Sequence, residues 1–315
     1  MMPEDFDSSG VDVFPDTNES VDVLPDTTPP VFSESFKVLG TIEQIYIWGA
    51  EPDLAVEILD PDGDLVHSGM TDYQGSLVVR DLVPGEGYLV RLADDPDDLT
   101  DSIAVLSLEG SFPGEEFYME QELHHGYQYI KMRDGVLLSA WISLPGPPED
   151  GPYPTLVNYS GYSPSRPARS LGAEVEPFCG LFPLLCEAPN FPSGLVTGLL
   201  GYAVVGVNMR GTGCSGGTYD YFEPLQLTDG YDLIEIVSRQ SWVKHNKVGM
   251  VGLSYPGISQ LFVGAQNPPG LAAICPFSVI ANSVTTLVPG GILNDGFALQ
   301  WIENVLDKAE PYAHG

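Results

Sequence analysis

A short turn between an apolar strand and a helix restricts the fold of this chain more than any other feature of its sequence. The strand-like residues VGMVG end at Gly252, Ser254 lies in the turn, and a helical pattern, GISQLFVGAQ, begins at Gly257. A serine held on such a turn projects its hydroxyl from the carboxyl end of a buried strand, near the helix N-terminus. A chance match in a chain with 35 glycines is the alternative, but the flanking strand and helix favour Ser254 as a nucleophile.

The region around this turn alternates between strands and longer connections. Two segments, YQYIKM and VLLSAWISL, are separated by Arg133-Asp134-Gly135 and predict a hairpin. Short continuous apolar runs follow, as is typical of strands buried on both faces of a sheet. Helical periodicity between them indicates an α/β domain with a largely parallel sheet. The predicted buried strands are residues 154–160, 202–209, 247–254 and 271–280, and the predicted helices are 229–243 and 257–266.

The N-terminal third of the chain has a different pattern. Residues 1–35 are acidic and proline-rich and contain an imperfect repeat, VDVFPDTNES then VDVLPDTTPP, so we expect a disordered linker. Residues 36–110 contain short strands of alternating polarity separated by turn signals, which favour a small β-sandwich-like accessory domain. The remaining segment, residues 111–315, contains the α/β domain.

Composition excludes several classes of function. The chain of 315 residues has a net charge of −32, which disfavours binding to nucleic acids or anionic membranes. No apolar run is long enough to span a membrane. The acidic turn that contains Asp60, Asp62 and Asp64 lacks the later glycine and glutamate of a calcium loop, so we expect no metal site. A disulfide between Cys179 and Cys186 and two free thiols there are both compatible with the spacing.

The visible start of the chain has neither a basic segment nor an apolar segment of a secretory signal. It therefore suggests a cytoplasmic protein, whereas the proline-rich tether suggests an exported protein if an upstream signal peptide is missing from the sequence. Localisation and oligomeric state stay open at this point.

Several motifs carry a family resemblance. The turn reads G-x-S-Y-x-G with Pro256 in place of a more usual glycine, and related stretches occur at 132–147, 156–164, 201–217 and 241–257. In order and context they resemble the X-Pro dipeptidyl-peptidase and cocaine-esterase-like serine hydrolases, over roughly residues 125–301. The resemblance implies an α/β-hydrolase fold, here C-terminally truncated and preceded by the β-sandwich-like domain, with a helical cap that starts at about 285–315.

The same resemblance implies an activity and roles for individual residues. Ser254 would form an acyl-enzyme with a small-molecule ester or peptide substrate, X-Pro dipeptides included, without a metal or organic cofactor. The backbone N–H of Tyr255 and the hydroxyl of Tyr162 would form the oxyanion hole, with Tyr159 as a rival to Tyr162. Arg210 is expected to be structural, and Asn208 stands where relatives often have aspartate.

The base and acid of a catalytic triad are not evident. In this fold the chain order is Ser, then Asp, then His, and the only histidine after Ser254 is His314, the penultimate residue. Neither His314 nor the aspartates Asp295 and Asp307 are expected to be catalytic. The chain is therefore expected to be the N-terminal portion of a longer enzyme and inactive by itself. The alternative is a non-catalytic binding protein with a degenerate hydrolase scaffold.

Overall fold

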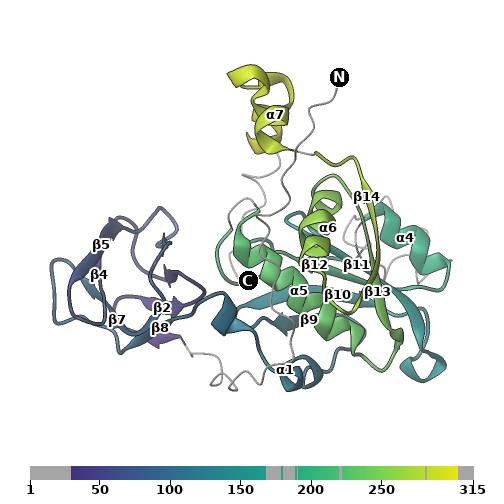
Figure 1. Ribbon diagram of the computed structural model, residues 1–315, viewed down its shortest axis with the longest axis horizontal. Helices are drawn as coiled ribbons and strands as arrows, with labels where there is room; N and C mark the ends of the chain where they lie inside the picture. The colour runs from purple at the N-terminus through teal and green to yellow at the C-terminus, as the bar shows by residue number, and fades with distance from the viewer. Residues whose placement is uncertain are drawn as a thin grey trace, which may run out of the picture.

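The computed structural model describes residues 30–167, 179, 189, 191–219, 222–280 and 282–303. These residues form a β-rich N-terminal part and a larger α/β part that lie side by side (Figure 1). Most of the predicted linker lies outside the described residues. The sheet of the first part nevertheless begins at Val31, within the predicted linker, because residues 31 and 32 pair with the next strand.

The N-terminal part is built from two four-stranded antiparallel sheets, as predicted for a β-sandwich. Side chains alternate between the two faces of each strand, so each sheet has one apolar face, and these two faces pack against each other. The residues completely buried between the sheets include Val38, Ile45, Ile47, Ile58 and Val90. One sheet has the order β1 (Val31–Phe32), β2 (Lys37–Gly40), β3 (Ile45–Trp48), β6 (Leu77–Val79), and the other has the order β5 (Leu65–Met70), β4 (Ala55–Leu59), β7 (Gly85–Leu92), β8 (Ile103–Val105).

The α/β part contains a six-stranded sheet. The predicted hairpin forms its antiparallel side, since β9 pairs with β10 and β10 pairs with β12, whereas β12, β11, β13 and β14 are parallel to one another. The carboxyl ends of these parallel strands therefore meet at one edge of the sheet. The order across the sheet is β14 (Leu271–Phe277), β13 (Val243–Leu253), β11 (Tyr153–Ser160), β12 (Ala203–Asn208), β10 (Leu137–Ser143), β9 (Gly126–Lys131).

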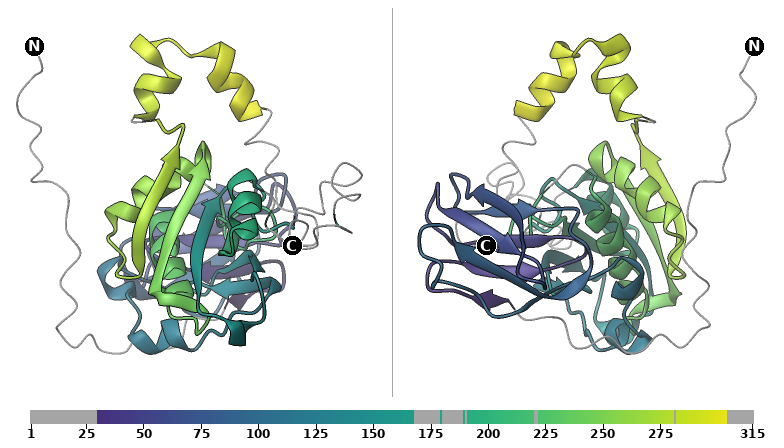
Figure 2. Two further views of the ribbon diagram at one scale, coloured as in Figure 1. Left: turned by 90° about the vertical axis from the view of Figure 1, so that its right-hand side faces the viewer. Right: turned by 60° about the vertical axis from the view of Figure 1, so that its left-hand side comes forward.

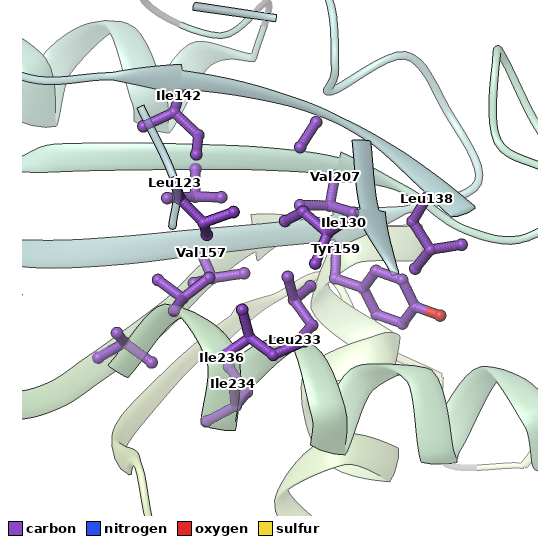
Figure 3. Close-up of a cluster of buried hydrophobic side chains, with 14 of the residues drawn as sticks. Leu123, Ile130, Leu138, Ile142, Val157, Tyr159, Val207, Leu233, Ile234 and Ile236 are labelled. Carbon is purple, nitrogen blue, oxygen red and sulfur yellow. The ribbon is translucent and has the colours of Figure 1, made fainter. Parts of the chain in front are cut away.

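Helices cover both faces of this sheet. On one face, α5 (Pro224–Ser238) and α6 (Tyr255–Ala265) pack against alternate strand residues such as Val157 and Val207 (Figure 3). On the other face, near α4 (Pro192–Leu199), Phe191 packs against Val204 and Val251. The continuous apolar runs in the sequence are thus explained, because both sets of alternate residues are buried.

Short helical segments complete the described chain. Before the sheet lie η1 (Glu109–Ser111) and α1 (Glu115–Met119), and η2 (Pro148–Asp150) joins β10 to β11. After β14, residues 282–303 extend beyond the carboxyl ends of the strands (Figure 2). They contain α7 (Ser283–Leu287), η4 (Pro289–Gly291) and a π-helical turn, η5 (Asp295–Leu299). No helix among the described residues has both the length and the apolar character needed to cross a bilayer.

The largest boundary differences from the sequence predictions concern one helix and the strand that follows it. The helix predicted over residues 229–243 begins at Pro224, because a proline at the first helical position has no N–H to lose and a suitable φ. It ends at Ser238, and β13 begins at Val243, where the helix was expected to continue. These shifts leave the predicted alternation of strands and helices unchanged.

Candidate active site

Ser254 lies between β13 and α6 in a strained backbone conformation. Its φ is 68° and its ψ is −122°, a region that non-glycine residues rarely adopt and that costs about 1–3 kcal/mol. Three hydrogen bonds hold the residue there: its N–H donates to the carbonyl of Phe277 at 2.9 Å, and its carbonyl accepts from Gly257 N at 2.8 Å and Ile258 N at 2.9 Å. The adjacent strand and the new helix therefore maintain the strain together.

Two glycines make room for this turn. A Cβ atom at Gly257 would lie 2.5 Å from the carbonyl oxygen of Phe277, and one at Gly252 would lie 2.6 Å from Cβ of Pro256. Both distances are too short for any side chain, and the first obstacle is backbone. The glycines of the G-x-S-Y-x-G motif are therefore required by close packing on each side of Ser254.

Tyr162 is brought to Ser254 from the loop after β11. Its hydroxyl oxygen lies 3.3 Å from Ser254 Oγ, and either atom is able to donate the hydrogen bond. The rival residue, Tyr159, points elsewhere: it is buried and its hydroxyl donates to the carbonyl of Gln226 at 3.1 Å. The structure thus places Tyr162, and not Tyr159, beside the serine.

Asn208, at the end of β12, fixes the loop that carries Tyr162. Its side chain is buried and fully hydrogen-bonded: Oδ1 accepts from the N–H of Ser165 at 3.1 Å and its hydroxyl at 2.7 Å. Its Nδ2 donates to the carbonyl of Tyr162 at 2.7 Å and to Thr212 Oγ1 at 3.1 Å. An ionised aspartate only accepts hydrogen bonds, so the asparagine is the residue that suits this position in this chain.

The Asn208→Asp variant is expected to lose about 1–3 kcal/mol of unfolding free energy at neutral pH, because a buried carboxylate would face the carbonyl of Tyr162 without a proton between them. The loss should shrink at acidic pH, where a protonated carboxyl donates one hydrogen bond again. Urea titrations of both proteins at neutral and acidic pH measure the difference. A loss that is independent of pH would contradict this account.

Aromatic rings surround Ser254 and Tyr162. The side chain of Tyr255 is completely buried and contacts Phe222 at 4.7 Å and Tyr162 at 5.6 Å between ring centroids. Trp301, from the segment after β14, donates from Nε1 to the Tyr162 hydroxyl at 3.2 Å, and its ring stacks on Phe297. The segment 282–303 therefore reaches back to the serine from above the sheet.

A buried ion-pair cluster joins the ends of the strands to α5. Arg210 forms hydrogen bonds to both oxygens of Asp229, at 2.6 and 2.7 Å, and to Asp134 at 3.0 Å. Nearby, Arg133 binds both oxygens of Asp232, at 2.6 and 2.9 Å. Burial raises the pKa of Asp229 to about 7, although the Arg210 guanidinium opposes that shift. Because Arg210 binds Asp134 and Asp229, the geometry supports the structural role expected for it.

Residues 134–314 match the sequence model of the family described as X-Pro dipeptidyl-peptidase (S15 family), which is more than half of the chain. The chain belongs to this family. Its mixed sheet with helices on both faces is the α/β-hydrolase fold, as predicted, and it follows an N-terminal part made of two sheets. S15-family proteins are hydrolases of esters and peptides, so hydrolase activity is the broad function of the family to which this chain belongs.

Several known proteins are similar to part of this chain. The S15-family chain is 29% identical to cocaine esterase of Rhodococcus sp. (strain MB1 Bresler) over 174 residues, which are 55% of this chain and 27% of the esterase. A CocE/NonD family hydrolase from Staphylococcus aureus has 26% identity and a TM-score of 0.47, with coverage of 58% of this chain and 32% of that chain. An alpha-amino acid ester hydrolase has 24% identity and a TM-score of 0.39, with coverage of 51% and 26%. The chain thus spans about a quarter to a third of the length of these relatives.

The histidines of the S15-family chain do not meet Ser254 within the described residues. His67 lies on β5, His124 and His125 precede β9, and His245 is near the amino end of β13, at the opposite end of that strand from the serine. Asp295 is exposed, while Asp307 and His314 lie outside the described residues. The described part of the chain also contains no group of His, Cys, Asp and Glu side chains that is suited to hold a metal ion.

The structure shows the state of Cys179, for which the sequence left a disulfide and a free thiol open. Cys179 is disulfide-bonded, so the interpretation as a free thiol is wrong at this position. Cys186, its suggested partner, lies outside the described residues. Cys214 and Cys275 are free.

Some residues of the site were not found from the sequence of this S15-family chain. Nothing in the local pattern around Trp301 indicates a contact with Tyr162, because the two residues are 139 positions apart. The sequence does contain a signal for the ion pairs of Asp229 and Asp232. Both lie in a segment predicted to be a core helix, where a buried carboxylate requires a cationic partner.

Proposed function

We propose that Ser254 is the nucleophile of a serine hydrolase that cleaves ester or amide bonds through an acyl-enzyme. The observation that carries the proposal is the position of Ser254 Oγ on a strained turn at the carboxyl edge of the sheet, 3.3 Å from the hydroxyl of Tyr162. A hydroxyl exposed on such a turn, with a second donor beside it, has the arrangement needed for acyl transfer.

In the proposed reaction, Ser254 Oγ attacks the substrate carbonyl carbon and the carbonyl oxygen acquires negative charge. Two donors stabilise that charge: the N–H of Tyr255, which lies in the first turn of α6, and the hydroxyl of Tyr162. Each donor contributes about 3 kcal/mol to the stability of the transition state. Collapse of the tetrahedral intermediate breaks the ester or amide bond, releases an alcohol or amine, and leaves the acyl group on Ser254 for hydrolysis by water.

The proton of Ser254 must pass to a base, and another group must orient that base. In this proposal both groups lie outside the residues that the structure describes. The reaction requires no metal or organic cofactor. The family description favours X-Pro dipeptides and the name of the esterase relative favours esters, while the family resemblance of the motifs adds amino-acid esters and aryl esters.

A fluorophosphonate probe tests the proposal, because it forms a covalent adduct with activated serines. With imidazole present as an external base, intact-mass measurement of the chain is expected to show one adduct, which is absent from the Ser254→Ala variant and present in Ser68→Ala, a matched change at an exposed serine of β5. Imidazole in the buffer supplies a general base and should accelerate labelling if the chain does not provide its own.

Two outcomes would contradict the proposal. In the first, the adduct persists in Ser254→Ala, so that another residue is labelled. In the second, the parent chain is folded by circular dichroism but takes up no probe even with imidazole, a result that favours a non-catalytic scaffold.

A further inference from the structure

We infer that Trp301 sets the direction of the Tyr162 hydroxyl proton and so makes Tyr162 a donor toward Ser254. This inference rests on the proposed function, because it assigns Trp301 as a positioning residue for the oxyanion hole of that same site. The contact that carries it is the hydrogen bond from Trp301 Nε1 to the Tyr162 hydroxyl oxygen at 3.2 Å.

The chemistry of the three groups gives the hydrogen bond a direction. An indole N–H is only a donor, so the Tyr162 oxygen accepts from Trp301. A phenol hydroxyl has one proton, and the other close partner of the Tyr162 oxygen is Ser254 Oγ at 3.3 Å. That second contact is ambiguous by itself, since either hydroxyl is able to donate. Trp301 occupies one of the two lone pairs of the phenol oxygen, which disfavours a second acceptance from Ser254 and favours a Tyr162 proton that points at the serine.

The direction matters for the oxyanion hole. A Tyr162 hydroxyl that accepted the proton of Ser254 would oppose its transfer to a base and would present a lone pair to the negatively charged oxygen. A hydroxyl that accepts from Trp301 is instead polarised, and it becomes a stronger donor because chained hydrogen bonds reinforce one another. Trp301 thus acts through Tyr162 on the charge that develops in the reaction.

The position of the indole is set by aromatic neighbours. Trp301 stacks on Phe297 with ring centroids 6.3 Å apart and planes 10° apart, and it lies 6.5 Å from the ring of Tyr255. Trp301 and Phe297 both belong to the segment 282–303, which lies beyond the carboxyl ends of the strands (Figure 2). The oxyanion donor is therefore correctly oriented only while this segment lies against the site.

The first test observes the hydrogen bond itself and does not depend on activity. The chain has four tryptophans, so a ¹H–¹⁵N spectrum shows few indole signals, and Trp301→Phe assigns one of them by its loss. In Tyr162→Phe, the Trp301 signal should move upfield and its N–H should exchange faster with water. The indole of Trp242, which donates to the carbonyl of Leu123 at 3.0 Å, is an internal control that should not change. Tyr159→Phe, which removes a hydroxyl bound to Gln226, should leave the Trp301 signal in place.

The second test distinguishes two roles of Trp301: orienting the Tyr162 hydroxyl, and simply packing against its neighbours or stacking on a substrate. Trp301→Phe keeps an aromatic ring beside Phe297 but removes the N–H. It is expected to slow fluorophosphonate labelling of Ser254 about tenfold in the parent and less than about twofold in the Tyr162→Phe background. A packing role would give the same loss in both backgrounds.

The outcomes distinguish the inference from the proposed function. An unchanged Trp301 signal in Tyr162→Phe, or equal losses of labelling rate in the two backgrounds, overturns the inference while Ser254 remains a labelled nucleophile. Failure of Ser254 to be labelled at all overturns the proposed function, and the indole spectrum then decides alone whether Trp301 orients Tyr162.

Discussion

Replacing Tyr162 by phenylalanine is expected to slow acylation of Ser254 about 100- to 1,000-fold, the loss typical of removing one oxyanion donor. The variant loses a single oxygen atom, 3.3 Å from Ser254 Oγ, and keeps the ring that packs against Tyr255. Because the donor acts on charge that is present mainly in the transition state, the rate of the bound complex should fall while substrate binding changes little. The measurement is the rate of fluorophosphonate labelling at a series of probe concentrations, which separates binding from reaction.

Tyr159→Phe is the matched control for this prediction. It makes the same chemical change three residues earlier, at a hydroxyl that donates to the carbonyl of Gln226 in the core. We expect it to lower stability by about 1 kcal/mol through the lost hydrogen bond and to leave the labelling rate nearly unchanged. A Tyr162→Phe variant as reactive as the parent, or a Tyr159→Phe variant equally slow, would remove Tyr162 from the proposed oxyanion hole.

Arg210→Met is expected to produce the largest loss of stability, about 3–5 kcal/mol of unfolding free energy, because it leaves carboxylates buried without their cation. The side chains of Asp134 and Asp229 have no exposed surface, and Arg210 is hydrogen-bonded to both. Methionine fills most of the space but provides no charge. Urea-induced unfolding followed by circular dichroism measures the difference.

The pH dependence of this loss has a definite sign. Burial already raises the pKa of Asp229 to about 7 in the folded protein, and loss of the opposing Arg210 charge should raise it further. When the pKa of a carboxyl group is higher in the folded protein than in the unfolded protein, the free energy of unfolding falls as the pH rises from the unfolded pKa to the folded pKa. The Arg210→Met variant should therefore be closest to the parent in acid and least stable, relative to the parent, above neutral pH.

Arg91→Met is the matched control for the buried cluster. Arg91 forms an ion pair with Glu57 at 2.6 Å, and both side chains are partly exposed, 31% and 21% respectively. Exposed pairs contribute about 0–1 kcal/mol, so this variant should unfold nearly as the parent does. Equal losses in the two variants would show that burial of the charges is not the cause.

The sequence predicts those parts of the fold and site that depend on local pattern. The turn around Ser254 is predictable because its strand, its two glycines and its helix are contiguous, and the positions of the parallel strands follow from runs of apolar residues buried on both faces, whereas their order across the sheet does not. The resemblance to a family added Tyr162, which the structure places at Ser254. Contacts between distant segments were not accessible in this way, since no local signal relates Asn208 to the loop of Tyr162 or Trp301 to its hydroxyl.

The segment after β14 shows how far a local pattern reaches. Residues 293–310 have helical periodicity, and the described part is helical from Asp295 to residue 303, beginning with the π-helical turn Asp295–Leu299. Gly290 and Gly291, which precede this helical part, have positive φ and separate it from α7. The side chain of Asn294 then accepts a hydrogen bond from Phe297 N at 3.2 Å and starts the turn. The periodicity thus indicates that the segment is helical but not that it begins with a π-helical turn.

The hydrogen bond from Ser254 N to Phe277 O ties the strained serine to β14, which is an outer strand of the sheet among the described residues. Outer strands open more easily than central ones, because fewer neighbours hold them. Each opening of β14 would release the N–H of Ser254 and allow its backbone to relax. The population of the reactive serine conformation is therefore coupled to the opening of one strand, and protection of the Ser254 amide against hydrogen exchange reports the free energy of that opening.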